Sequence, residues 1–172
     1  MAHDLETIVT DIVKQVLGGE SSDVKTSSAT VKNSMTKMNL SAAKKTIEAV
    51  QKKASEMGVK AVTAVADAGG NPIAVECMDD AFIASYDIAV NKAFTVVSLK
   101  MPTKNLASLA APGGSLYGIQ FTNGGKIVIF GGGEPLTNKD GVIIGGLGVS
   151  GGTAEQDTAL GEYGKAFFES LN

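Results

Sequence analysis

Residues 59–95 read VKAVTAVADAGGNPIAVECMDDAFIASYDIAVNKAFT. Residues 59–66 are apolar and β-branched enough for a strand, and residues 67–72 are dense in turn-forming residues. Residues 72–78 alternate as a returning strand would. From Ala81 the period changes to three and four, which predicts a helix with Phe82, Ser85, Ala89, Lys92, Ala93 and Val96 on one face. A hairpin and one helix cannot bury their own faces, so the rest of the chain must pack around them.

The segments on both sides of this unit supply the other layers. A helix is predicted for residues 41–57, with Ser41 as its N-cap, and another for residues 153–171. Strands are predicted for residues 126–130 and 142–150, separated by a glycine turn. Strands that follow one another through hairpins predict an antiparallel sheet of about five strands with helices on its faces, an α/β (α+β) fold.

An irregular segment lies between the hairpin unit and the last strands. It contains a short predicted helix at residues 106–110 and an apolar segment at residues 116–121, LYGIQF. The strands after it are rich in glycine. Because such strands and a short apolar segment need cover, we expect the core to form a homo-oligomer.

Composition limits the classes of function. The chain has 172 residues, enough for one domain plus an appendage, and a net charge of −3 with no long basic run, which argues against nucleic acid as a partner. Cys77 is the only cysteine, which excludes an internal disulfide and fits a reducing, cytoplasmic compartment. No apolar run is long enough for a transmembrane helix, so no membrane association is expected.

The first 19 residues predict an amphipathic docking helix. Its apolar stripe consists of Leu5, Ile8, Val9, Ile12, Val13 and Val16, followed by Leu17. Residues 20–38 follow as a predicted flexible linker, because eight of these nineteen residues are Ser or Thr and none is aromatic, Gly or Pro. The helix is expected to dock on a partner; the alternative is that it folds back on its own domain, residues 39–172.

Two blocks of sequence carry a resemblance to a known family. The first is VADAGGNPI at residues 65–73, followed by Met78-Asp79, Ala89 and Lys92-Ala93; the second is GGEPL at residues 132–136, IGGLGVSGG at residues 144–152 and Gln156-Asp157. In order and spacing they resemble the haem-degrading family, also called GlcG/HbpS-like, which includes the C-terminal domain of PduO. The resemblance implies a profilin-like α/β/α architecture and a tetrapyrrole ligand, haem or corrinoid.

The N-terminal helix is similar to the encapsulation peptides of bacterial microcompartment cargo. Such a peptide ahead of a PduO-like domain implies shell or cargo proteins as partners and a location inside a microcompartment. No P-loop or adenosyltransferase domain is found in the sequence, so corrinoid adenosylation by this chain alone is not expected. Whether the chain is an enzyme is left open, since no catalytic constellation is recognisable.

The motif Gly146-Leu147-Gly148-Val149-Ser150-Gly151 has the form G-x-G-x-x-G. A dinucleotide site would need a second strand and an acidic residue about 20 residues later, and the chain ends first. Two interpretations remain. Either the strand needs close backbone packing, or the amides of Gly151, Gly152 and Thr153 hold a carboxylate such as a porphyrin propionate.

Four further residues are candidates for the site. Asp67 is predicted to be a turn residue. Asp79 is expected to open and cap the following helix, and the resemblance implies a ligand-pocket role as the alternative. Lys92 is either a snorkelling lysine or a cation for an anionic ligand. Cys77 has no partner histidine and is predicted to pack rather than to act as a nucleophile.

The only histidine in the sequence is His3, ahead of the docking helix. An axial ligand to haem would therefore be Met, Cys77, Tyr, Lys or an oxygen, and no zinc or Ser-His-Asp set is predicted. Two hypotheses follow. The chain is a microcompartment cargo protein that binds haem or corrinoid and supports cobalamin redox or recycling, or it is a ligand-free oligomeric scaffold. An open pocket near Asp79 and Lys92 would favour the first.

Overall fold

A computed structural model describes residues 35–171. The predicted docking helix and most of the predicted linker lie outside these residues. The helices are α2 (Leu40–Glu56), α3 (Ile83–Leu99), α4 (Leu106–Leu109) and α5 (Ala154–Ser170), with short 3-10 helices at Thr103–Asn105, Ile119–Phe121 and Asn123–Gly125. The strands are β1 (Val62–Asp67), β2 (Pro72–Cys77), β3 (Gly133–Thr137) and β4 (Ile143–Ser150).

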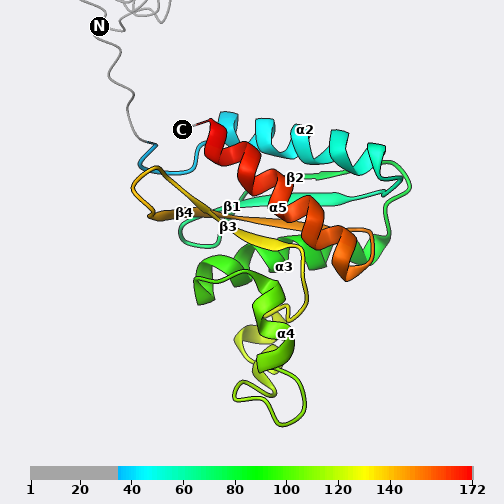
Figure 1. Cartoon of the computed structure of the whole chain (residues 1–172), viewed down its shortest axis with the longest axis vertical. Coiled ribbons are helices and arrows are strands. Elements are labelled where there is room, and N and C mark those ends of the chain that lie inside the picture. Colours follow the sequence, from blue (N-terminus) through cyan, green and yellow to red (C-terminus); the bar gives the residue numbers. More distant parts are fainter. Residues whose placement is uncertain (1–34, 172) are drawn as a thin grey trace, which may run out of the picture. The chain divides into compact units, whose positions relative to one another are not determined.

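The described strands form one antiparallel sheet in the order β2-β1-β4-β3. Helices α2 and α5 cover one face of the sheet and α3 covers the other, so the molecule has three layers (Figure 1). The predicted α/β/α class is confirmed. The sheet has four strands in place of the expected five or so.

The missing strand is the one predicted at residues 126–130. This segment has no ladder partner; instead the hydroxyl of Thr95 on α3 donates to the carbonyl of Lys126 and accepts from the amide of Val128. A side chain therefore satisfies the backbone that a strand would have paired. The edge strand β3 was not predicted: the expected glycine turn covers residues 131–133, and the strand GEPLT begins at the last of these and contains a proline.

Two helix starts illustrate local control of the fold. The N-cap of α2 is Asn39, whose Oδ1 accepts from the amide of Ala42 at 2.9 Å, so the prediction of Ser41 as N-cap was wrong. Helix α5 begins with a capping box in which the Thr153 side chain accepts from the Gln156 amide and the Gln156 side chain accepts from the Thr153 amide.

The larger core cluster lies between the sheet and the α2–α5 layer. Ile47 and Val50 of α2, Leu147 of β4 and Phe168 of α5 are fully buried in it. Met38 is 6% exposed and belongs to the same cluster, so the last residue of the predicted linker is part of the packed domain.

On the other face, α3 lies almost directly on β4. A Cβ added to Gly148 would be 2.0 Å from the carbonyl oxygen of Ala89, and one added to Gly146 would be 2.3 Å from that of Ala93. Both obstacles are backbone atoms of α3. The glycines of the G-x-G-x-x-G motif therefore serve the close packing that was one of the two predicted interpretations.

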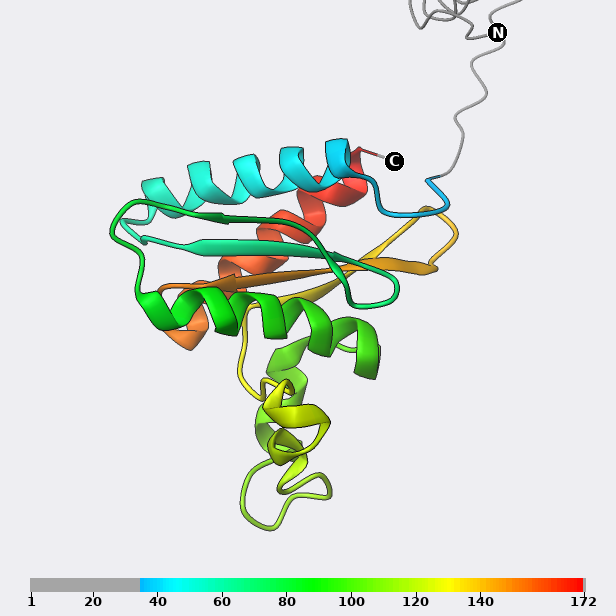
Figure 2. The ribbon, with the colours of Figure 1, turned by 180° about the vertical axis from the view of Figure 1, so that it is seen from behind.

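The segment after α3 projects from the body of the domain. It carries α4 and the three short 3-10 helices, and it forms the arm at the bottom of both views (Figures 1 and 2). The predicted apolar segment at residues 116–121 lies here as turns and one 3-10 helix, with Tyr117 and Phe121 exposed.

Candidate functional site

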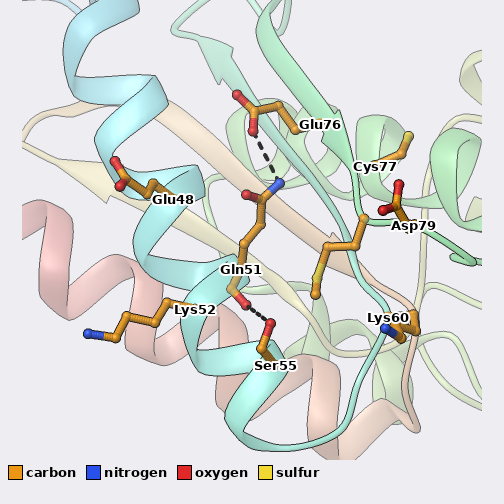
Figure 3. A pocket seen from close by; sticks show the side chains of 9 residues that line it. Glu48, Gln51, Lys52, Ser55, Lys60, Glu76, Cys77 and Asp79 are labelled. Carbon is orange, nitrogen blue, oxygen red and sulfur yellow. Dashed lines mark hydrogen bonds between the residues drawn. The ribbon is translucent and has the colours of Figure 1, made fainter.

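A groove of about 590 Å³ lies between α2 and the end of β2. We call it the Asp79 groove. It is lined by Glu48, Gln51, Lys52 and Ser55 of α2, by Lys60, and by Glu76, Cys77, Met78 and Asp79 at the end of β2 (Figure 3). The predicted site residue Asp79 thus faces an open groove.

Hydrogen bonds fix the wall of the groove. Gln51 reaches from α2 to β2 and donates to the Glu76 carboxylate at 3.1 Å, and the Ser55 hydroxyl donates to the Gln51 carbonyl (Figure 3). The sulfur of Met78 accepts from the amide of Ala61 at 3.4 Å. These contacts hold helix and strand at the separation that leaves the groove open.

Asp79 follows β2 in a turn that leads into α3. The next residue, Asp80, has a positive φ of 64°, and the N-cap of α3 is Phe82, which makes no side-chain capping bond. Asp79 therefore does not cap α3, which was one of its two predicted roles. It lines the groove together with Glu48, Glu76, Lys52 and Lys60, and the Lys52 side chain extends away from Asp79 (Figure 3).

Lys92 is not in this groove. It is 0% exposed, and its ammonium donates to Asp157 Oδ2 at 2.8 Å and to the carbonyl of Val149 at 2.7 Å. The Phe130 ring lies 5.0 Å from the same Nζ atom. Burial lowers the pKa of Lys92, and the charge and hydrogen bond of Asp157 oppose that shift. Lys92 does not snorkel, and its partners fill the space around it.

Gly151 and Gly152 lie just before α5, and neither lines the groove. The Gly152 amide donates to Asp157 Oδ1 at 2.9 Å, and the Thr153 amide is taken by the capping box. The protein's own acceptors thus occupy the amides of Gly152 and Thr153, two of the three that were predicted to hold a propionate. Asp157 joins Lys92 to Gly152, so these candidates form one buried polar cluster separate from the groove.

Asp67 is a turn residue, as predicted. Its Oδ1 accepts from the amides of Gly69 and Asn71 at 2.8 and 2.9 Å. The hydrogen bond from the Asn71 amide is the main cause of the lowered pKa of Asp67. Among the described residues, no group of three or more His, Cys, Asp or Glu side chains is arranged to hold a metal ion.

The sequence did not indicate the α2 side of the groove. Glu48, Gln51 and Lys52 lie off the apolar stripe of α2, so they read as an ordinary solvated face. Lys60 precedes β1 and carries no motif. Only the pairing of β2 with β1 and the packing of α2 on that hairpin bring them to Asp79. The groove carries two lysines among three carboxylates, and Met78 places a sulfur atom beside it, whereas the Cys77 side chain points away from α2 (Figure 3).

The family model described as "Haem degrading protein HbpS-like" matches residues 38–166. The chain belongs to this HbpS-like family. The matched range begins at the buried Met38 and spans the sheet and its helices. This HbpS-like domain has no helix, within the residues that the structure describes, long and apolar enough to cross a membrane.

Two protein relatives share much of the domain. A 15.0 kDa protein from the dhaT-dhaS intergenic region of Citrobacter freundii is 48% identical over 134 residues, which are 78% of this chain and 94% of that protein. The corrinoid adenosyltransferase PduO of the same organism is 41% identical over 110 residues, 64% of this chain. The match spans about a third of PduO, at 32% of its length.

Two solved structures share the HbpS-like fold. Klebsiella pneumoniae protein ORFY superposes with a TM-score of 0.76 at 45% identity, over 78% of this chain and 92% of that one. The structure named "PduOC:Heme Complex" superposes with a TM-score of 0.72 at 35% identity, over 76% and 94% of the two chains. The predicted relation to the PduO C-terminal domain is therefore confirmed.

Proposed function

We propose that this chain is a haem-binding, microcompartment-associated protein whose ligand lies in the Asp79 groove. The proposal is carried by the similarity to the PduO C-terminal domain, which has been solved as a haem complex, together with an open groove at the predicted residue Asp79. Corrinoid is the second tetrapyrrole to be considered, since PduO is a corrinoid adenosyltransferase.

The side chains of the groove fit a haem in their donor chemistry. Haem iron accepts Met or Cys sulfur as an axial ligand, and Met78 and the exposed Cys77 line the groove. Lys52 and Lys60 would pair with the propionates. Ligation by Met78 would release its hydrogen bond from the Ala61 amide, and ligation by Cys77 would require its side chain to turn from the α3 side of β2 toward the groove, so either residue would need to rearrange. When bound, the haem would supply one-electron chemistry.

The test is a hemin titration followed by absorbance, with charge-matched variants. We expect Soret changes for the parent, and at least a tenfold weaker Kd, about 1.4 kcal/mol, for the double variant Lys52→Glu, Lys60→Glu. The control is Lys44→Glu, Lys45→Glu, which reverses two exposed lysines of α2 outside the groove and should bind like the parent. Equal weakening by both pairs would contradict the groove as the site.

Within a microcompartment, we propose that the bound tetrapyrrole supports cobalamin redox or recycling. We also propose that the apolar stripe of the N-terminal segment binds the shell and so directs the chain into the microcompartment. The variant Ile12→Glu would bury a charge in that stripe, and Lys14→Glu changes its polar side. Burying an unpaired charge is costly, so only Ile12→Glu should abolish co-purification with assembled shells. If both variants co-purify with the shells as well as the parent does, the stripe does not target the chain to the shell.

The alternative is an oligomeric scaffold without a cofactor. It is favoured by the absence of histidine from residues 35–171 and by exposed apolar side chains such as Ile83 and Phe121. The same titration separates the two functions. No change in the Soret band up to about 50 µM hemin, and no change in the corrin absorbance with cobalamin, would support the scaffold function. In either case we propose a homo-oligomer, to be measured by light scattering.

A further inference from the structure

The two edges of the sheet differ in how their backbone groups are used. On β3, the amide of Val149 donates to Gly132, which by alternation directs the backbone groups of Gly133 and Pro135 away from β4. The Gly133 amide is taken by the Thr103 hydroxyl at 2.9 Å, and Pro135 has no N–H to offer. This edge is closed to a further strand.

The edge formed by β2 is open. The Met78 amide donates to Ala61, and with the register Thr63↔Glu76 this directs Glu76 toward β1 and leaves the backbone groups of Val75 and Cys77 pointing outward. Proteins usually guard an edge with lysine or proline within it. β2 has no lysine, and its proline is only its first residue, Pro72.

Helix α3 continues this surface on one side of the strand. Its sheet-facing side carries Ala89, Ala93 and Val96, but its outward side is also apolar, with Ile83 98% exposed, Tyr86 exposed, and Val90 and Phe94 half-buried. A helix that is apolar on both sides is normally covered on both. We call the open edge of β2 with Ile83, Tyr86, Val90 and Phe94 the β2–α3 surface.

The strand and the helix lie together in space. Val75 and Val90 pack against the same core cluster, and a Cβ on Gly70, just before β2, would be 2.8 Å from the Phe94 ring. The C-terminal half of α3 therefore lies at the start of β2 and its N-terminal half near the end. Figure 2 shows α2 beside β2, and α3 on the other side of the sheet next to β4.

The exposed charges differ between the two ends of this surface, although each end also has a charge of the other sign nearby, Lys60 beside Asp79 and Asp67 in the turn before β2. Asp79 and Asp80 follow β2, and Asp87 is exposed near the start of α3. At the other end, the Lys126 ammonium lies 5.5 Å from the centre of the Phe94 ring. A second copy related by a two-fold axis would run antiparallel, so the acidic end of one copy would meet Lys126 of the other. The surface is thus complementary to itself.

We propose that two copies of this chain associate through the β2–α3 surface, pairing β2 with β2 to form one continuous antiparallel sheet. The inference rests on the homo-oligomer in the proposed function and assigns its interface. Like charges directly opposite each other on paired strands are unfavourable. The register that places Glu76 opposite Glu76 of the second copy is therefore disfavoured. The remaining registers place the two-fold axis at Val75 or at Cys77. The second copy would then run beside the Asp79 groove, along its open β2 side.

The first experiment uses Val75→Pro against Val75→Ala. Both remove the two valine methyl groups, but only proline removes the outward N–H, which an isolated edge strand does not use. By light scattering, Val75→Pro should at least halve the particle mass while Val75→Ala keeps the parent mass, with unchanged far-UV circular dichroism. Ile83→Lys should likewise halve the mass, and Phe121→Lys, an equally exposed position on the arm, should not.

The second experiment uses the single cysteine of the chain. Centring on Cys77 places the two Cys77 Cα atoms about 5.5 Å apart, which permits a disulfide, and centring on Val75 separates them by about 14 Å, within reach of a bismaleimide. A covalent dimer through Cys77 is expected in either case. If the parent is oligomeric, yet Val75→Pro and Ile83→Lys keep its mass and Cys77 does not cross-link, this interface is wrong while the homo-oligomer stands. A monomeric parent overturns both.

Discussion

At the scale of single residues, the buried pair Lys92–Asp157 joins three elements. Lys92 of α3 reaches Asp157 of α5 and the carbonyl of Val149 on β4, and Asp157 also holds the amide of Gly152. A buried ion pair contributes little net stability, but removing one partner leaves an uncompensated charge. The pair therefore specifies how α3 and α5 sit on the sheet.

We expect Lys92→Met to lower the free energy of unfolding by about 3–5 kcal/mol, because Asp157 would remain buried and unpaired. The double variant Lys92→Met, Asp157→Leu should recover much of that loss. Urea unfolding of both variants measures the difference. A double variant as unstable as the single one would show that the Gly152 hydrogen bond, not the ion pair, dominates.

Glu134 gives a prediction on pH. It is 3% exposed on β3, and burial raises its pKa above the ordinary 4.5, while Lys165 opposes that shift. The folded state thus holds this proton to a higher pH than the unfolded state does. Its contribution to stability is fully present below the unfolded pKa and is lost as pH rises through the folded pKa.

Glu134→Gln should therefore raise the free energy of unfolding at pH 7, by on the order of 1 kcal/mol, and by less at pH 4. Urea unfolding at both pH values provides the measurement. Glu48→Gln, on the exposed face of α2, is the control and should change little. A variant that is less stable than the parent at pH 7 would mean that the attraction of Lys165 outweighs the cost of burial.

At the scale of elements, the close contact between α3 and β4 requires a glycine on β4. Helix α5 also has a glycine at its contact with the core, but there the neighbouring atoms belong to side chains. A Cβ at Gly148 meets the backbone of Ala89 at 2.0 Å, whereas one at Gly164 of α5 meets the side chains of Leu147 and Val50 at 2.6 Å. Side chains can move and a helix backbone cannot without shifting the whole helix. The two positions therefore differ in tolerance, although both are glycines in the core.

Gly148→Ala should destabilise the fold by about 3 kcal/mol or more, at the upper end of overpacking costs. Gly164→Ala should cost less, because a helical alanine also gains about 1 kcal/mol over glycine. Thermal unfolding of the two variants compares them directly. Equal losses would indicate that α3 can move away from β4 more easily than this packing suggests.

At the scale of the whole molecule, the packed domain begins before α2. Met38 is buried in the larger core cluster, and the half-buried Met35 packs against it. The packed domain therefore begins before residue 39, the boundary expected from the sequence, at about the start of the described residues.

Deletion of residues 1–34 should leave the free energy of unfolding unchanged. Deletion of residues 1–38 should lower it by roughly 1.5–3 kcal/mol, the contribution of one buried methionine side chain. Urea unfolding of the two truncated proteins and the parent tests this. A loss on removing residues 1–34 alone would indicate that the N-terminal helix packs on its own domain.

The sequence by itself determined the class of the fold and the family. The hairpin at residues 62–77, the helices α2, α3 and α5 and the strand β4 all follow from local apolar periods, turn residues and caps, which act over a few neighbours. Asp67 as a turn residue follows from the same local chemistry. Asp79 as a groove residue came from the family resemblance, because its role depends on what packs against it.

Only the tertiary structure decided the rest. Residues 126–130 have strand composition, but the hydroxyl of Thr95, some thirty residues earlier, takes their backbone bonds. The sequence makes Lys92 and Gly152 candidates for ligand binding, but the carboxylate of Asp157 accepts hydrogen bonds from the ammonium of Lys92 and from the amide of Gly152. The α2 wall of the groove and the open edge of β2 arise from contacts between distant segments. Such contacts produce no periodic pattern in the sequence. Each segment would have the same pattern of apolar, turn and capping residues if its distant partner were absent.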